Sequence, residues 1–63
     1  MNLNLYISVI NADEVVHIIN REKTMFYGMI RNAYCELSED YLNNAKVIAV
    51  YSGFGGLCIE AVI

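Results

Sequence analysis

The sequence contains no proline and no tryptophan, and its 63 residues include only two cysteines and four basic residues. The sequence has no linker, repeat or low-complexity stretch, so we predict a single domain over residues 1–63. A chain of this length buries only about 60% of the surface that it exposes when unfolded. Domains this small usually depend on disulfides, a metal or oligomerisation for stability.

The two cysteines, Cys35 and Cys58, are too few for a disulfide framework. They also lack the close spacing of cysteine pairs in structural zinc sites, so we predict no metal site and no cofactor. We interpret both thiols as small buried hydrophobic side chains. Met1 leads directly into an apolar run without a basic segment or cleavage site. We therefore expect no secretion signal and a reducing, cytoplasmic location.

Long apolar runs and clusters of positive charge are also missing. No run approaches the about 20 apolar residues of a membrane-spanning helix, so we predict no membrane partner. Four basic residues stand against seven acidic ones, and the formal net charge is −3. Because phosphate backbones are bound by clustered lysine and arginine, we predict no direct nucleic-acid binding.

Apolar side chains are present in excess. The hydrophobic fraction is 57%, above the about 45–50% of ordinary domains. A small domain cannot bury all of this surface, and larger exposed apolar patches usually mark interfaces. The sequence also ends on apolar Ile63, within a predicted strand whose edge a second subunit would protect. We therefore expect a homodimer or a larger homo-oligomer.

Periodicity in the first half predicts a strand followed by a helix. Apolar residues alternate with mostly polar ones over residues 2–9, as in a half-buried strand: Leu3, Leu5, Ile7 and Val9. Asn11 with Glu14 three residues later is typical of a helix start, and helical spacing continues to Leu37. We predict one long or kinked helix over residues 12–36. The alternative is a helix over 12–20 followed by a strand over 24–31.

The second half predicts a short helical turn and a hairpin. Ser38 is a candidate cap for the turn, and residues 47–51 form an apolar run expected of a strand buried on both faces. Residues 53–56 contain three glycines and predict a hairpin loop. The last strand places one set of apolar residues on one face: Leu57, Ile59, Ala61 and Ile63. The predicted fold class is α/β (α+β), with β-α-β-β order and one main helix on a three-stranded sheet.

We predict partner-binding residues in two places. The first is an acidic, tyrosine-bearing segment, called the acidic segment below: Tyr34, Glu36, Glu39, Asp40 and Tyr41. Tyrosine provides contact area at low entropic cost, and carboxylates complement basic partners; the alternative is a plain solvated turn. The second is Phe54 in the glycine-rich loop, where exposed aromatic residues often act as anchors; the alternative is a ring folded back on the sheet.

No catalytic set is recognisable. His17, the single histidine, lies four residues after Asp13 and could be oriented by it in a helix, but no nucleophile completes the set. Cys35 would lie about 27 Å from His17 along a continuous helix. The loop at 53–56 leads into a strand, whereas phosphate-binding glycine loops lead into a helix. We therefore predict that the protein is not an enzyme.

The leading functional hypothesis is a non-enzymatic protein-binding module, such as a small inhibitor or regulator of a larger enzyme or complex. A phage-type anti-defence or antitoxin-like role is a general expectation for small acidic proteins, which no residue here indicates. One alternative is an oligomeric binder of a small ligand or nucleotide, with pockets between subunits lined by Tyr6, Tyr27, Arg31 and Tyr51. The other is a small oligomeric enzyme whose shared active site uses His17 or the carboxylates.

Overall fold

The computed structural model describes residues 1–53 and 55–63. Its elements, in chain order, are α1 (Leu3–Ser8), β1 (Val15–Asn20), β2 (Lys23–Met29), α2 (Ile30–Glu36), α3 (Glu39–Asn44), β3 (Lys46–Gly53) and β4 (Gly56–Val62). The four strands form one mixed sheet in the order β2-β1-β4-β3. The central β1 and β4 are parallel, and both outer pairs are antiparallel. The predicted α+β class is confirmed.

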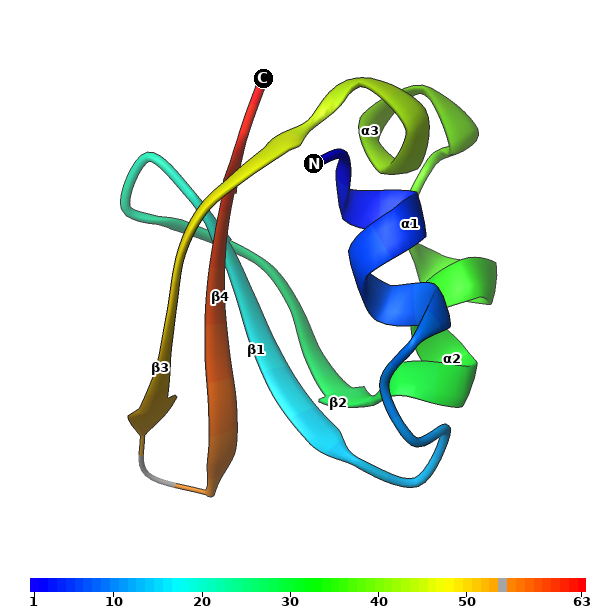
Figure 1. Ribbon diagram of the computed structural model, residues 1–63, viewed down its shortest axis with the longest axis vertical. Coiled ribbons are helices and arrows are strands. Elements are labelled where there is room, and N and C mark those ends of the chain that lie inside the picture. Colours follow the sequence, from blue (N-terminus) through cyan, green and yellow to red (C-terminus); the bar gives the residue numbers. More distant parts are fainter. Residues whose placement is uncertain (54) are drawn as a thin grey trace.

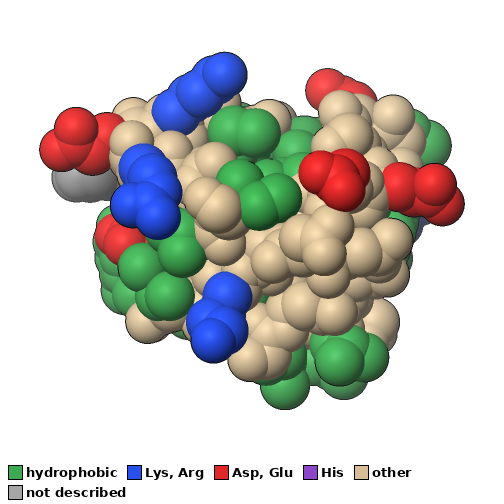
Figure 2. Space-filling model, turned by 90° about the horizontal axis from the view of Figure 1, so that it is seen from above, with side chains coloured by type: hydrophobic (Ala, Val, Ile, Leu, Met, Phe, Trp, Pro, Cys, Tyr) green, Lys and Arg blue, Asp and Glu red, His purple; other side chains and the backbone are tan. Residues whose placement is uncertain are grey.

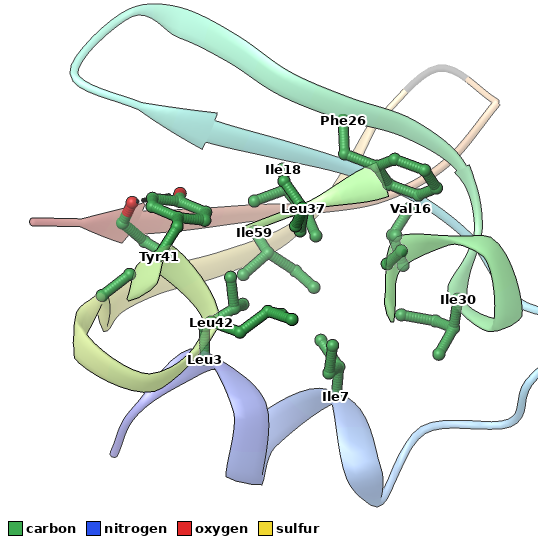
Figure 3. Packing of buried hydrophobic residues seen from close by; sticks show 13 residues of the cluster. Leu3, Ile7, Val16, Ile18, Phe26, Ile30, Leu37, Tyr41, Leu42 and Ile59 are labelled. Atoms are coloured by element: carbon green, nitrogen blue, oxygen red, sulfur yellow. Dashed lines mark hydrogen bonds between the residues drawn. The ribbon is translucent and has the colours of Figure 1, made fainter. Parts of the chain in front are cut away.

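The predicted β-α-β-β order and single main helix are wrong. Three short helices take the place of the one long helix that was predicted. All three lie on the same side of the sheet (Figure 1). The core fills the space between this helical layer and the sheet, as the labelled side chains in Figure 3 show. None of the helices in the described part of the chain lies on the opposite face of the sheet.

The first element is a helix where the sequence predicts a strand. Leu3 and Ile7 are buried, whereas Leu5 and Val9 are exposed. Buried residues four apart share one side of a helix, and the Asn2 side chain caps α1 by accepting a hydrogen bond from the Leu5 N–H at 2.8 Å. The run of Leu3, Leu5, Ile7 and Val9 fits both periods, and this cap favours the helical one.

The long helix predicted over residues 12–36 is replaced by a hairpin and α2. In β1, Val16 and Ile18 are buried while their neighbours are half-buried, which is the period of a strand. Asn20 pairs with Lys23 across a two-residue turn. Within that turn, Arg21 and Glu22 have φ values of 48° and 73°, as in a type I′ turn. The alternative strand over 24–31 corresponds to β2, but residues 12–20 are not helical.

The second half follows the prediction more closely. Ser38 caps α3 as predicted, since its hydroxyl accepts a hydrogen bond from the Tyr41 N–H. Gly53 pairs with Gly56, so the hairpin is also confirmed. Gly56 has a φ of +148°, and a Cβ there would overlap the Val15 carbonyl oxygen, so only glycine lets β4 approach β1 here. Phe54 lies outside the described residues.

Burial in the last two strands differs from the prediction in part. Ile59 and Ala61 are buried on the core face of β4, as predicted, whereas Ile63 follows the strand and is exposed. β3 was expected to be buried on both faces. It lies at the edge of the sheet instead, and its residues are half-buried or exposed. The cysteine prediction is wrong as well, because Cys35 is exposed and Cys58 is half-buried.

The core is apolar apart from one phenol. Side chains from α1, the central strands, α2 and α3 meet in it: Leu3, Ile7, Val16, Ile18, Ile30, Leu42 and Ile59. Burying each such side chain contributes about 1.5–3 kcal/mol. Tyr41 reaches in from α3 and donates a hydrogen bond from its hydroxyl to the Ala61 carbonyl oxygen at 2.6 Å (Figure 3). This bond ties the helical layer to β4.

Within residues 1–53 and 55–63, none of the helices combines the length and apolar character that crossing a membrane requires.

Replacing Glu22 by glycine is expected to stabilise the protein. Glu22 has a positive φ, and left-handed backbone costs a residue with a Cβ about 1–2 kcal/mol relative to glycine. Glu22→Gly should therefore raise the free energy of unfolding by about 1 kcal/mol in urea denaturation followed by circular dichroism. Glu39→Gly, within α3, serves as the control and should lower it. A fall in stability for Glu22→Gly would contradict the type I′ turn.

The Tyr41 hydroxyl is expected to make stability fall at alkaline pH. Burial raises the pKa of Tyr41 above its usual value. The folded state then holds this proton more tightly than the unfolded state, so the contribution is complete below about pH 10 and is lost as pH rises further. Tyr41→Phe should lower stability by about 1–2 kcal/mol at neutral pH, because the hydrogen bond is lost.

The same variant should show a smaller loss of stability between about pH 9 and about pH 11 than the unmodified protein. Urea titrations at several pH values measure both effects. Tyr34→Phe, at an exposed tyrosine of α2, is the control and should change neither. An alkaline loss that is equal in the Tyr41→Phe variant and the unmodified protein would contradict the assignment to Tyr41.

Candidate functional site

The face of the sheet that carries no helix bears a row of polar and aromatic side chains. His17 is directly opposite Tyr27 on β2 and Cys58 on β4, and Cys58 is opposite Tyr51 on β3. Residues paired across neighbouring strands lie on the same face, and successive residues alternate between faces. Since Ile18 and its partner Ile59 are in the core, these four residues lie on the uncovered face. We call Tyr27, His17, Cys58 and Tyr51 the aromatic row.

Specific contacts hold both ends of the aromatic row. The rings of His17 and Tyr27 meet edge to face, with centroids 5.4 Å apart and planes at 67°, the arrangement that aromatic pairs prefer. His17 Nε2 also lies 2.8 Å from Thr24 Oγ1. At the other end, the Tyr51 hydroxyl donates a hydrogen bond to Glu60 Oε1 at 3.2 Å. Tyr27 is nevertheless 58% exposed and Tyr51 is 47% exposed.

The surroundings of Tyr51 keep its phenol protonated. Partial desolvation on the sheet, followed by the hydrogen bond to Glu60 and the negative charge of that carboxylate, raises the pKa of Tyr51. The hydroxyl therefore remains a donor at neutral pH and engages the Glu60 carboxylate. The uncovered face thus carries the Glu60 carboxylate, which accepts this hydrogen bond, among mainly uncharged side chains.

Basic residues gather at one end of the sheet. Arg21 lies in the turn after β1, Lys23 begins β2, and Lys46 pairs with Val62 near the end of β4. Because β1 and β4 run in the same direction, these three of the four basic residues lie at one end of the sheet. Figure 2 looks onto this end and shows the Lys and Arg side chains over one half, where acidic side chains also occur, and further acidic side chains over the other half. We call Arg21, Lys23 and Lys46 the basic end.

The structure places the predicted acidic segment in the helical layer, away from the aromatic row. Tyr34 and Glu36 are exposed on α2, and Glu39 and Asp40 are exposed in the first turn of α3. Tyr41 is buried in the core, so its ring offers no contact surface. The acidic segment is thus not one continuous patch of tyrosines and carboxylates. Phe54, the other predicted residue, lies outside the described part of the chain.

The proposed pairing of His17 with Asp13 is wrong, because residues 15–20 are a strand and Asp13 forms an ion pair with Arg31. The structure instead places His17 next to Cys58, a neighbour that sequence reasoning missed because it depends on the pairing of β1 with β4. His17 Nε2 is within hydrogen-bonding distance of Thr24, and the structure records no hydrogen bond between the imidazole and the Cys58 thiol.

The residues predicted to line a ligand pocket are divided between two layers. Tyr27 and Tyr51 share the uncovered face, whereas Tyr6 is on α1 and Arg31 is on α2. The surface formed by the described residues contains no pocket. Among those same residues, no group of three or more His, Cys, Asp and Glu side chains is close enough to hold a metal ion.

Compared with known proteins, the chain matches no protein-family model. It also shows no significant similarity to a curated protein sequence or to a solved structure. The uncovered face and its aromatic row are therefore interpreted from their own geometry.

The contact between Tyr51 and Glu60 can be measured directly. Glu60→Gln keeps the size of the side chain but removes the negative charge, and this charge contributes to the raised pKa of Tyr51. We expect the pKa of Tyr51 to fall in this variant, followed by NMR titration of ¹³C-labelled tyrosine rings. Glu39→Gln, on α3, is the control and should leave Tyr51 unchanged. An unchanged Tyr51 titration in Glu60→Gln would contradict the contact.

Proposed function

We propose that the protein is a non-enzymatic protein-binding module and that the uncovered face of its sheet is the contact surface. The observation that carries this proposal is the aromatic row, which crosses all four strands and leaves Tyr27 and Tyr51 about half exposed. Exposed aromatic side chains that gather on one face are typical of an interface. Here the chain supplies helices for one face, so a partner would supply the cover for the other.

The chemistry of the aromatic row suits a protein interface. Tyrosine buries a large ring at low entropic cost and keeps a hydroxyl for hydrogen bonding, so it is enriched among residues that dominate binding energy. The contacts with His17 and Glu60 hold the two rings in place before binding, which reduces the entropy lost on association. Half-buried apolar neighbours, Val15 and Ile19 on β1, would add area around them.

The size of the surface is compatible with a specific interface. The protein exposes 3954 Å² in total, and a standard interface covers about 800 Å² of each partner. The required area is thus about a fifth of the protein surface, and the uncovered face is one side of a four-stranded sheet. The contact would therefore occupy the whole uncovered face, with His17 and Cys58 on the central strands and the two tyrosines on the outer strands.

Charge indicates the chemistry of the partner. The uncovered face carries Glu60 within it and the basic end along one side, so we expect an apolar protein surface with carboxylates placed to meet Arg21, Lys23 and Lys46. Three basic residues accompanied by Glu22 and Glu60 are a poor match for a phosphate backbone, which needs clustered positive charge. A module of this size bound over a partner's surface would act as an inhibitor or regulator of a larger enzyme or complex.

Tyr27 and Tyr34, exposed tyrosines in different layers of the fold, provide a matched test. Tyr27 is 58% exposed on the sheet and Tyr34 is 45% exposed on α2. The unmodified protein and the variants Tyr27→Ala and Tyr34→Ala are used as immobilised baits, and each captured protein is purified and titrated by calorimetry. We expect Tyr27→Ala to weaken binding about tenfold or more, as for a tyrosine that dominates an interface, and Tyr34→Ala to leave it unchanged.

Two outcomes would overturn this proposal. Loss of binding in Tyr34→Ala but not in Tyr27→Ala would place the contact on the acidic segment. Binding of single-stranded DNA or RNA oligonucleotides that depends on Tyr27 would show that the aromatic row stacks on bases, which is a different class of function. Circular dichroism confirms that each variant is folded.

A further inference from the structure

The two edges of the sheet are protected to different degrees. β2 begins with Lys23, has a register shift against β1 opposite Ile18 and Ile19, and runs directly into α2. Charges and an irregular register are features that discourage an edge strand from pairing with another chain. β3 has a register shift between Val47 and Ala49, and its sequence contains no charged residue and no proline after Lys46.

The N-terminal residues already cover the first part of the β3 edge. The Val47 N–H donates to the Met1 carbonyl oxygen at 3.0 Å, and Asn2 forms an antiparallel bridge with Lys46. The β3 edge therefore accepts an additional antiparallel strand at its beginning. Among the described residues nothing continues this pairing, so the edge over residues 48–53 remains uncovered. We call residues 48–53 the open edge.

The open edge also exposes large apolar side chains. Ile48 is 57% exposed, Val50 is 37% exposed, and Tyr51 is about half exposed. An unpaired edge strand that exposes three apolar residues within four positions is prone to pair with another strand. A strand from another molecule would form hydrogen bonds with the unpaired backbone groups and would also cover these side chains.

We propose that the open edges of two copies of this chain pair antiparallel around a two-fold axis. The open edge is complementary to itself, as such an interface requires. With Val50 opposite Val50 of the partner subunit, Tyr51 lies opposite the partner subunit's Ala49, so a large side chain faces a small one. Lys46 lies outside the paired residues 48–52, so no like charges meet. The two four-stranded sheets then form one continuous sheet.

This contact is expected to be weak. A pair of short edges buries less than the about 800 Å² per partner of a standard interface, so we expect a dissociation constant in the micromolar to millimolar range, on the order of 100 µM. The contact does not depend on the protein-binding function proposed above, because it uses the edge and leaves Tyr27 and His17 free. Val50 is the residue to change, since Tyr51 belongs to both surfaces.

The test is sedimentation velocity from about 10 µM to about 1 mM, with a reductant present so that Cys35 and Cys58 cannot form disulfides. We expect dimers to appear with rising concentration in the unmodified protein. In Val50→Lys, two lysines would face each other across the two-fold axis, and dimers should disappear throughout this range. Val9→Lys, at an exposed valine after α1, is the control and should dimerise normally.

Amide hydrogen exchange of the unmodified protein gives a second test that needs no variant. Amides of the open edge should exchange more slowly at about 1 mM than at about 10 µM, whereas those of β2 should not change. A monomer at all concentrations would overturn the proposal. So would dimers that persist in Val50→Lys, dimers that are lost equally in Val9→Lys, or slowed exchange on β2 rather than on the open edge.

Discussion

β1 and β4 pair in parallel at the centre of the sheet, with Val16 opposite Leu57 and Ile18 opposite Ile59. Antiparallel neighbours can be joined by a tight turn, whereas parallel strands need a long connection that crosses over the sheet. Here that connection contains α2 and α3, and both lie on the same side as α1 (Figure 1). The parallel pair therefore determines which face is covered, and with it which face is left open.

The same pairing brings together the residues of the aromatic row. Tyr27 and His17 belong to the β1–β2 hairpin, and Cys58 and Tyr51 belong to the β3–β4 hairpin. Either hairpin alone would be marginally stable in water. They become one sheet because Val16, Ile18 and Ile59 share a single core with the helices. The uncovered face is thus organised by packing on its reverse side, which holds the aromatic row in register.

Local signals with one interpretation were predictable from the sequence. Ser38 can cap a helix and the glycines at 53–56 can form a hairpin, and the structure has both features. Residues 2–9 and 15–20 were ambiguous because apolar side chains occur at both period two and helical spacing. Burial of Leu3 with Ile7, and of Val16 with Ile18, resolves each case, and burial is a property of the assembled core. The turn at Arg21 and Glu22 lacks the Asn-Gly signature of its type.

The candidate site was harder to predict for a related reason. The acidic segment is contiguous in sequence, so composition alone could identify it, and four of its five residues are indeed exposed. Tyr41 is the exception because its ring packs in the core and its hydroxyl donates a hydrogen bond to the Ala61 carbonyl oxygen. The aromatic row has no contiguous signature. It exists only when strands separated by about 40 residues pair, as His17 and Cys58 do.

Among the described residues, neither the open edge nor the uncovered face has a covering element. Three helices of six or seven residues cover one face of the four strands, and Met1 and Asn2 cover only the beginning of the β3 edge. Pairing two open edges would place two aromatic rows side by side on one continuous sheet, since a two-fold axis perpendicular to the sheet keeps both uncovered faces on the same side. A partner with two matching surfaces would then be held by both copies, and its apparent affinity would exceed that of either copy alone without any new contact.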